Sequence, residues 1–239
     1  MNILHHYNSD HNTTSAKEII PYIFGMMPEK THSVLDIGCG IGQWLYVFKE
    51  NGVETVLGID GEHVPPEKIM VDKKSEFKIF DLKNIKNLTL EKPFDIALSL
   101  EVAEHLPKEN AVDFVDFLTR SSDTVIFSAA VIGQTGENHV NEQNPDYWKE
   151  LFKKNGYVML DAFREKFWNN KNVNWWYRQN MYLFVKEKNM NLFPFKEYKN
   201  FYIHPELFTL KEKILHKEQK TKKGLFQKLK RVLIKVRGE

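Results

Sequence analysis

The segment VLDIGCGIG, residues 34–42, constrains the fold of this chain more than any other stretch. An apolar run that ends at Asp36 and passes into three alternating glycines is typical of a buried strand that turns tightly into a helix, because glycine permits tight turns and close approach of a ligand. A second apolar run, VLGID, ends at Asp60. An acid at the end of a second strand can accept hydrogen bonds from ribose hydroxyls, while the helix N-terminus faces the ligand. The two halves together predict a nucleoside-binding site.

The spacing of the glycines separates two kinds of nucleotide site. A dinucleotide fingerprint requires Gly-x-Gly-x-x-Gly with a pyrophosphate over the helix, whereas this chain has Gly-x-Gly-x-Gly with Asp36 two residues before the first glycine. A carboxylate there suits an ammonium and a sulfonium group better than a phosphate. The segment resembles motif I of the class I S-adenosylmethionine-dependent methyltransferases. An ordinary strand-turn-helix and a dinucleotide-binding dehydrogenase are the alternatives to this interpretation.

The resemblance implies S-adenosylmethionine as methyl donor and assigns Asp60 to the ribose. Asp81 matches the position where an acid of this family contacts the adenine amino group; its alternative role is to cap the following turn. The expected cofactor-binding residues are Asp36, Gly38, Cys39, Gly40, Gly42, Asp60, Gly61, Asp81, Leu82 and Leu100.

Strand patterns alternate with helix patterns along the chain. Strands are expected at residues 77–82, 94–100 and 123–131, and a helix over 108–119 has its apolar residues on one face. This alternation predicts a doubly wound α/β sheet, whose ligands lie beyond the carboxyl ends of its strands. The family resemblance implies that residues 157–163 and 180–187 form an antiparallel pair, which completes a Rossmann-like sheet of seven strands with a helical C-terminal extension.

The sequence Glu-x-x-Glu-His directly follows the fourth predicted strand, with Glu101, Glu104 and His105. Positions i, i+3 and i+4 of a helical turn share a face. With His139 they make a plausible site for Mg²⁺ or another divalent cation. The pattern resembles the small-RNA 3′-end 2′-O-methyltransferases, residue by residue for the first three and by position only for His139. In the metal-free alternative, His105 or His139 is a general base and Glu101 lies near the sulfonium. The catalytic candidates under both hypotheses are His105, His139 and Glu101.

The segment over residues 164–179 is rich in aromatic and arginine residues, which either bind the acceptor or pack onto the sheet. The acceptor-binding candidates are Arg164, Trp168, Trp175, Trp176, Tyr177 and Arg178. The strings NHVNEQNPDYW and FWNNKNVNWWYRQNMYLFV resemble a bacterial group of methyltransferases associated with surface-glycan pathways. The resemblance extends to about residue 188 and implies O-methylation of a sugar or a nucleotide-activated capsule precursor, with a phosphate-type substituent as a further option.

Two further alternatives concern the function: an RNA acceptor and a non-catalytic protein. An RNA acceptor would need a basic surface, but the chain's net charge of +2 is unevenly spread. Residues 211–239 contain eleven Lys or Arg and three Glu, net +8, so residues 1–210 carry −6. This argues against a nucleic-acid partner. A non-catalytic binding protein with the same fold is the other alternative.

We expect residues 1–188 to form the methyltransferase domain and residues 189–239 an aromatic and then basic extension. Residues 224–238 have a basic amphipathic pattern that is typical of a membrane-surface or protein-binding helix. The chain has one cysteine and no apolar run long enough to span a bilayer. We therefore expect a cytoplasmic protein, with peripheral attachment at the inner membrane surface through the basic tail.

Overall fold

The computed structural model describes residues 12–236, which divide into two units between Phe201 and Tyr202. This division lies later than the boundary expected after residue 188. The reason is that the chain beyond the last strand continues to pair with the sheet: Asp161 N–H donates to Lys196 O at 3.0 Å, and Tyr198 N–H donates to Met159 O at 2.8 Å. The aromatic part of the extension therefore belongs to the first unit.

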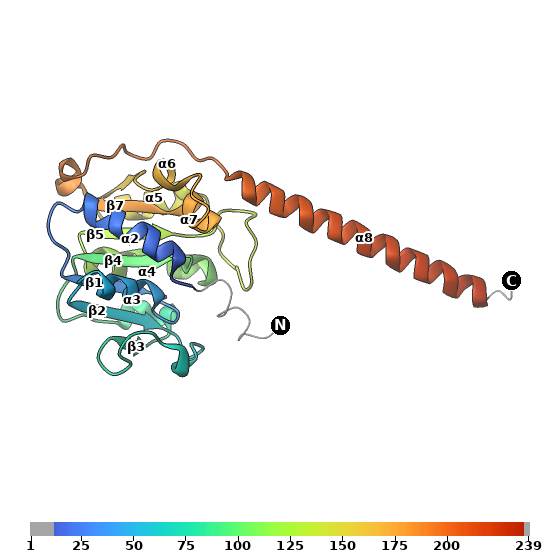
Figure 1. Cartoon of the computed structure of the whole chain (residues 1–239), viewed down its shortest axis with the longest axis horizontal. Helices are drawn as coiled ribbons and strands as arrows, with labels where there is room; N and C mark the ends of the chain where they lie inside the picture. Colours follow the sequence, from blue (N-terminus) through green and yellow to red (C-terminus); the bar gives the residue numbers. More distant parts are fainter. Residues whose placement is uncertain (1–11, 237–239) are drawn as a thin grey trace. The chain divides into compact units, whose positions relative to one another are not determined.

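The first unit is built on a seven-stranded sheet in the order β3-β2-β1-β4-β5-β7-β6 (Figure 1). The first five strands are parallel, and β7 is antiparallel to both of its neighbours. The strands are β1 (Ser33–Ile37), β2 (Thr55–Asp60), β3 (Phe77–Ile79), β4 (Ile96–Leu100), β5 (Thr124–Ser128), β6 (Tyr157–Leu160) and β7 (Tyr182–Lys186). The predicted doubly wound sheet and its antiparallel closing pair are confirmed.

Helices cover both faces of the sheet. One buried apolar cluster contains side chains of α2 and α3, and the other contains side chains of α4 and α5. β4 is buried along its whole length, as expected of a central strand packed on both faces. The helices of this unit are α2 (Thr14–Met26), α3 (Gln43–Glu50), α4 (Ala111–Ser121), α5 (Pro145–Lys154), α6 (Arg164–Phe167) and α7 (Trp175–Asn180). The 3-10 helices are η1 (Pro66–Lys68), η2 (Leu82–Asn87), η3 (Ala103–His105), η4 (Lys108–Asn110) and η5 (Glu187–Leu192).

Two elements differ from the sequence prediction. β3 ends at Ile79 rather than near residue 82, because the chain turns into η2, whose first free amide, Lys83 N–H, donates to the Asp81 side chain at 3.0 Å. The expected loop over 164–179 contains the short helices α6 and α7, and α7 includes the aromatic residues Trp175, Trp176 and Tyr177.

The second unit consists mainly of α8 (Pro205–Val236), a single helix that includes most of the predicted basic segment. Among residues 12–236, no helix combines the length and the apolar character needed to cross a bilayer.

Candidate active site

The glycine turn lies at the carboxyl end of β1, against the turn that follows β4. Gly38 has a φ of +80°, which L-residues rarely adopt, and a Cβ at this position would lie 2.3 Å from Val102 Cγ2. The turn is also tied to β2, because Gly38 N–H donates to Ile59 O at 2.8 Å. A glycine is therefore required twice over, by backbone conformation and by space.

Asp60, at the end of β2, is oriented by two backbone amides. Gly40 N–H donates to Oδ2 and Gly61 N–H to Oδ1, each at 2.6 Å. Burial raises the pKa of Asp60, whereas the two amides and His63 lower it. Each carboxylate oxygen can accept a second hydrogen bond, so the fixed carboxylate retains two acceptors for the hydroxyls of a ribose. These residues fit the nucleoside that the sequence predicts.

Asp36 lies beneath the glycine turn and is buried. Burial raises its pKa to about 8, and the nearby charge of Asp60 adds to this effect. A bound cation such as an α-ammonium group would favour the ionised form. The neighbouring Cys39 is buried too, and its Sγ would lie 2.6 Å from a Cβ at Gly58, so it packs against β2.

The residues expected to contact the adenine differ in their exposure to solvent. The exposed Asp81 accepts from Lys83 N–H and from Asn84 Nδ2, both at 3.0 Å, which is the turn cap foreseen as its alternative role. Leu82 and Leu100 are buried at the ends of their elements. The adenine role of these residues stays a prediction.

Glu101 links three parts of the chain. It has a φ of +57°, a strained conformation for a residue with a side chain, and its N–H donates to the backbone and hydroxyl oxygens of Ser128. Its carboxylate accepts from Asn180 Nδ2 at 3.1 and 3.3 Å and from Gln134 Nε2 at 3.0 Å. Burial raises its pKa, and these hydrogen bonds lower it. Glu101 thus connects the end of α7 and the loop after β5 to the end of β4.

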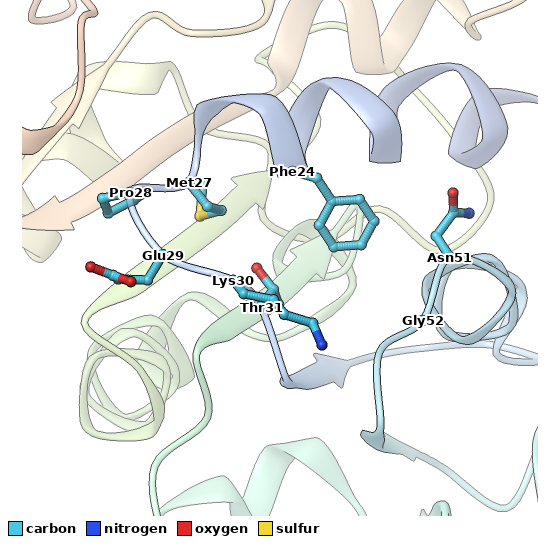
Figure 2. Close-up of a pocket in the computed structure, with 8 residues that line it drawn as sticks. All are labelled: Phe24, Met27, Pro28, Glu29, Lys30, Thr31, Asn51 and Gly52. Carbon is cyan, nitrogen blue, oxygen red and sulfur yellow. The ribbon is translucent and has the colours of Figure 1, made fainter.

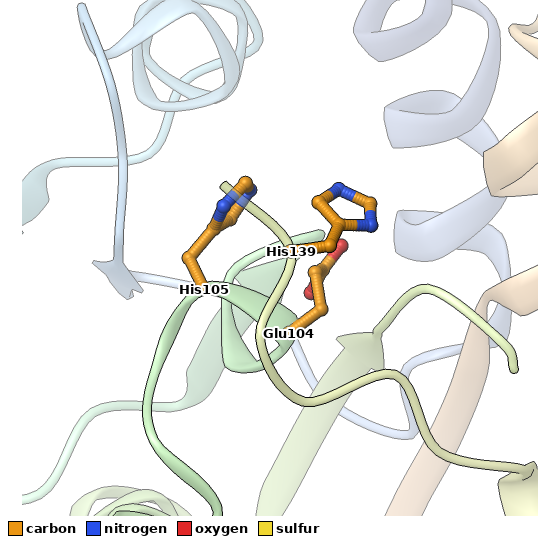
Figure 3. Close-up of side chains that lie close together, drawn as sticks. All are labelled: Glu104, His105 and His139. Atoms are coloured by element: carbon orange, nitrogen blue, oxygen red, sulfur yellow. The ribbon is translucent and has the colours of Figure 1, made fainter. Parts of the chain in front are cut away.

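Three of the four predicted metal ligands come together. Glu104, His105 and His139 each offer one ligand atom, and these atoms lie within 4.8 Å of one another; Glu101 is not a member of this group. Figure 3 shows Glu104 and His105 on the turn after β4 and His139 on the loop after β5. The two imidazole rings are nearly perpendicular, with centroids 4.9 Å apart.

Glu104 is fully buried, and within residues 12–236 neither of its carboxylate oxygens has a hydrogen-bond partner. The amides of Glu104 and Ala130 lie close enough to lower its pKa, but neither has hydrogen-bond geometry. Burial, followed by the charge of Glu101, raises the pKa of Glu104 well above its usual range. A buried carboxylate without donors is costly unless a proton or a cation neutralises it.

The loop after β5 reaches this group through the backbone of Glu104. Val140 and Asn141 both donate their N–H groups to Glu104 O, at 2.9 and 3.0 Å. These two bonds hold the preceding residue, His139, beside His105. The sequence indicated His139 only by its position in the chain. The hydrogen bonds of Val140 and Asn141 to Glu104 O explain physically why His139 lies beside His105.

The two arginines of the predicted acceptor segment face inward. Arg164 is 1% exposed; it pairs with Asp161, donates to Asn200 O at 3.0 Å and stacks on Tyr182 and Tyr198. Arg178 is also buried, and its guanidinium donates to Trp168 O at 3.0 Å. Both arginines therefore contact other parts of the fold at this edge, and their expected role in binding an acceptor stays a prediction.

The aromatic residues of the same segment are different, because they are only half-buried. They are Trp168, Trp175, Trp176 and Tyr177. Tyr177 packs edge-on against Trp44, with ring centroids 5.4 Å apart, and shares side-chain hydrogen bonds with Trp44 and Trp176. Burial raises its pKa, and the nearby charges of Glu101 and Asp36 add to the effect. Sequence analysis missed Trp44, although its place in the first turn after the glycines was a signal.

A comparison with known protein families matches the part of the chain that carries most of these site residues. The model of a methyltransferase domain family matches residues 7–121, which contain the glycine turn, Asp60 and the group's first two members. This stretch of the chain is therefore a methyltransferase domain. No curated protein matches the chain in sequence.

Solved structures share its fold at low identity. Magnesium protoporphyrin IX methyltransferase from Synechocystis PCC 6803, with bound SAH, has a TM-score of 0.51 and 17% identity over 73% of this chain and 83% of that one. DesVI from Streptomyces venezuelae has a TM-score of 0.54 and 12% identity, with 77% and 95% covered. PKMT2 from Rickettsia typhi, in complex with AdoHcy, has a TM-score of 0.52 and 14% identity, with 77% and 55% covered. At these identities the likeness shows the fold alone.

A cavity of about 410 Å³ lies elsewhere, at the amino ends of the parallel strands (Figure 2). It is lined by Phe24, Met27, Pro28, Glu29, Lys30, Thr31, Asn51 and Gly52. None of the predicted site residues is among them. The cavity is therefore separate from the candidate active site at the opposite edge.

Proposed function

We propose that the methyltransferase transfers the methyl group of S-adenosylmethionine to a hydroxyl oxygen of a sugar or a nucleotide-activated glycan precursor. The half-buried rings of α7 support this acceptor class, because partly exposed aromatic faces and polar edges suit sugar rings. The surroundings are acidic, because Asp36 and Glu101 both lie near Tyr177 and Glu101 lies near Glu104. The two arginines of the segment are engaged inside the fold. A neutral hydroxyl suits this site better than a phosphate-type group.

We further propose that Glu104, His105 and His139 hold a divalent cation. The observation that carries this is the fully buried Glu104 carboxylate without hydrogen-bond donors, beside two imidazoles. Carboxylate oxygen is a common ligand of Mg²⁺ and Mn²⁺, and imidazole nitrogen is a common ligand of Zn²⁺ and other transition metals. A cation there would lower the pKa of an acceptor hydroxyl that it contacts.

The chain's own residues provide alignment. Asp60 and the glycine turn fix the nucleoside, and the rings of α7 hold the acceptor over the methyl group. The acceptor oxygen attacks the methyl carbon while the carbon–sulfur bond breaks, which yields a methyl ether, S-adenosylhomocysteine and one proton. The proton leaves through the exposed side of the site, where His105 lies.

Calorimetric titration of chelator-treated protein with Mn²⁺ tests the cation site. We expect one bound ion per chain, and at least tenfold weaker binding in Glu104→Gln, since that change removes the charged ligand. Glu137→Gln is the matched control, because Glu137 is an exposed carboxylate on the same loop as His139. Turnover that survives chelation but is lost in His139→Ala would instead support a metal-free base.

Transfer of a radiolabelled methyl group to a panel of acceptors tests the substrate class. We expect label in neutral sugars or nucleotide sugars and none in short single-stranded RNA. Label in RNA, together with filter binding that is lost when residues 202–239 are removed, would contradict the glycan proposal. Cofactor binding without transfer to any acceptor would favour a non-catalytic role.

A further inference from the structure

One carboxylate that no motif singled out contacts His139 directly. Glu142 Oε1 lies 2.9 Å from His139 Nδ1, and both side chains are largely shielded from solvent, at 13% and 17% exposed. A carboxylate only accepts hydrogen bonds, so Nδ1 must carry the proton in this contact. The lone pair of a neutral His139 ring then lies on Nε2.

A glycine keeps space at that second nitrogen. A Cβ added to Gly136 would lie 2.2 Å from His139 Nε2, closer than real Cβ contacts allow. Only a residue without a side chain leaves the Nε2 edge of the ring in its present place. The surroundings of the two His139 nitrogens are thus determined by two different residues: Glu142 accepts a hydrogen bond from Nδ1, and Gly136 has no side chain to crowd Nε2.

Glu142 also fixes the loop on which His139 stands. Its Oε2 accepts from Gly133 N–H at 2.8 Å, and its Oε1 accepts from Thr135 N–H at 2.6 Å. Thr135 has a φ of +60°, an unfavourable conformation for a β-branched residue. Strained backbone of this kind persists only where surrounding contacts impose it, and it is concentrated at functional sites.

We propose that Glu142 is the positioning residue of the site: it fixes His139 as the Nδ1–H tautomer and directs the Nε2 lone pair toward the group formed with Glu104 and His105. Such a carboxylate–histidine pair sets the ring orientation and increases the basicity of the other nitrogen. The inference rests on the proposed role of His139 as a ligand, and it adds the residue that prepares His139 for that role.

The first test is the tautomer of His139 in the full-length, metal-free protein. Histidine labelled with ¹⁵N reports which ring nitrogen is protonated, and His139→Ala assigns the signals. We expect protonation at Nδ1 in the neutral ring of the wild-type chain. In Glu142→Gln we expect a shift toward the Nε2–H form, because an amide cannot accept from all three donors as two carboxylate oxygens do.

The second test is Mn²⁺ affinity in three variants. Glu142→Gln should weaken binding about tenfold or more, whereas Glu137→Gln, an exposed carboxylate on the same loop, should leave it unchanged. Gly136→Ala gives an independent check should Glu142→Gln fold poorly: it retains the Glu142 contact and the Nδ1–H tautomer, but it crowds Nε2 and should also weaken Mn²⁺ binding. Unchanged affinity for S-adenosylmethionine shows that each variant is folded.

The outcomes separate the inference from the proposed function. Mn²⁺ binding by a wild-type chain with the Nε2–H tautomer, or by Glu142→Gln with wild-type affinity, would overturn the role of Glu142 and leave the cation site standing. An Nδ1–H tautomer in a chain that binds no Mn²⁺ would reject the cation site and support the orientation of His139 by Glu142.

Discussion

Asp36 and Glu104 are two buried acids with raised pKa values, but each can be neutralised by a different partner. Asp36 lies next to Asp60 under the glycine turn, where the α-ammonium group of a donor suits it. Glu104 lies beside two imidazoles, where a cation suits it. In the free protein a proton neutralises each buried acid, and the positively charged ligand replaces that proton, so ligand binding is coupled to proton release.

The pKa of about 8 for Asp36 gives a pH prediction. The folded apo protein binds this proton more tightly than the unfolded chain does, so its stability should fall as pH rises from about 4 to about 8. Affinity for S-adenosylmethionine should rise between about pH 6 and pH 7.5, by up to about tenfold per pH unit, because the ionised carboxylate pairs with the ammonium group. The nearby groups are Asp60, Cys39 and Tyr177.

Calorimetry of S-adenosylmethionine binding in two buffers of different ionisation enthalpy measures the protons released. Asp36→Asn should remove most of the release and flatten the pH dependence. A wild-type affinity that does not change with pH would show that Asp36 is already ionised in the free protein.

The sequence could predict the position of a site residue where that position depends on local spacing. It could not do so where the position depends on tertiary contacts. The positions of Asp36 and Asp60 follow from the strand-turn-helix pattern, and the structure places both at the glycine turn. The pattern cannot show that Glu104 and not Glu101 joins the histidines, since this depends on amides from Gln134 and Asn180. The role of Glu142 depends likewise on the path of its loop.

At the scale of elements, the site depends on how the turn after β1 packs against the turn after β4. Gly38→Ala would place a methyl group 2.3 Å from Val102 Cγ2 and strain the backbone at φ +80°. We expect a loss of about 2–4 kcal/mol in the free energy of unfolding, the sum of strain and overpacking. Chemical denaturation measures it.

Gly52→Ala is the matched control for this variant. Gly52 has a φ of +92° and no atom within 4 Å of an added Cβ, so only backbone strain should remain, about 1 kcal/mol. Equal losses in the two variants would show that contact with Val102 does not restrict the glycine turn.

The segment containing α6 and α7 gives a second prediction at this scale. Arg164→Met should cost about 3–5 kcal/mol of stability, because it leaves Asp161 without its buried partner. Lys171→Met, an exposed change in the same segment, should have little effect. Unchanged stability with a raised KM for the acceptor would contradict the structural role and support Arg164 as an acceptor-binding residue.

For the whole molecule, the parallel sheet and its antiparallel closing pair could be predicted because buried strands and amphipathic helices are encoded by local periodicity. The boundary between the two units could not be predicted, because the sequence of residues 189–201 resembles an extension. Only the structure shows that Lys196 and Tyr198 pair with the edge of the sheet. The role of α8 as a membrane-surface helix rests on its basic amphipathic sequence and remains a proposal.

Truncation after Phe201 tests this division. The shortened chain should keep the melting temperature and the S-adenosylmethionine affinity of the full chain, because the sheet and both apolar clusters are complete without residues 202–239. Sedimentation with anionic vesicles should occur only for the full chain. A truncated chain that unfolds, or that still sediments with vesicles, would contradict these assignments.

The most direct test of a donor and a cation sharing one edge of the sheet is the NMR signal of S-adenosylmethionine labelled with ¹³C at its methyl group. In the presence of the wild-type chain and Mn²⁺, the bound methyl signal should broaden strongly, and Glu104→Gln should bind the donor without this broadening. A donor that does not bind, or a methyl signal that is unaffected by saturating Mn²⁺, would contradict the account.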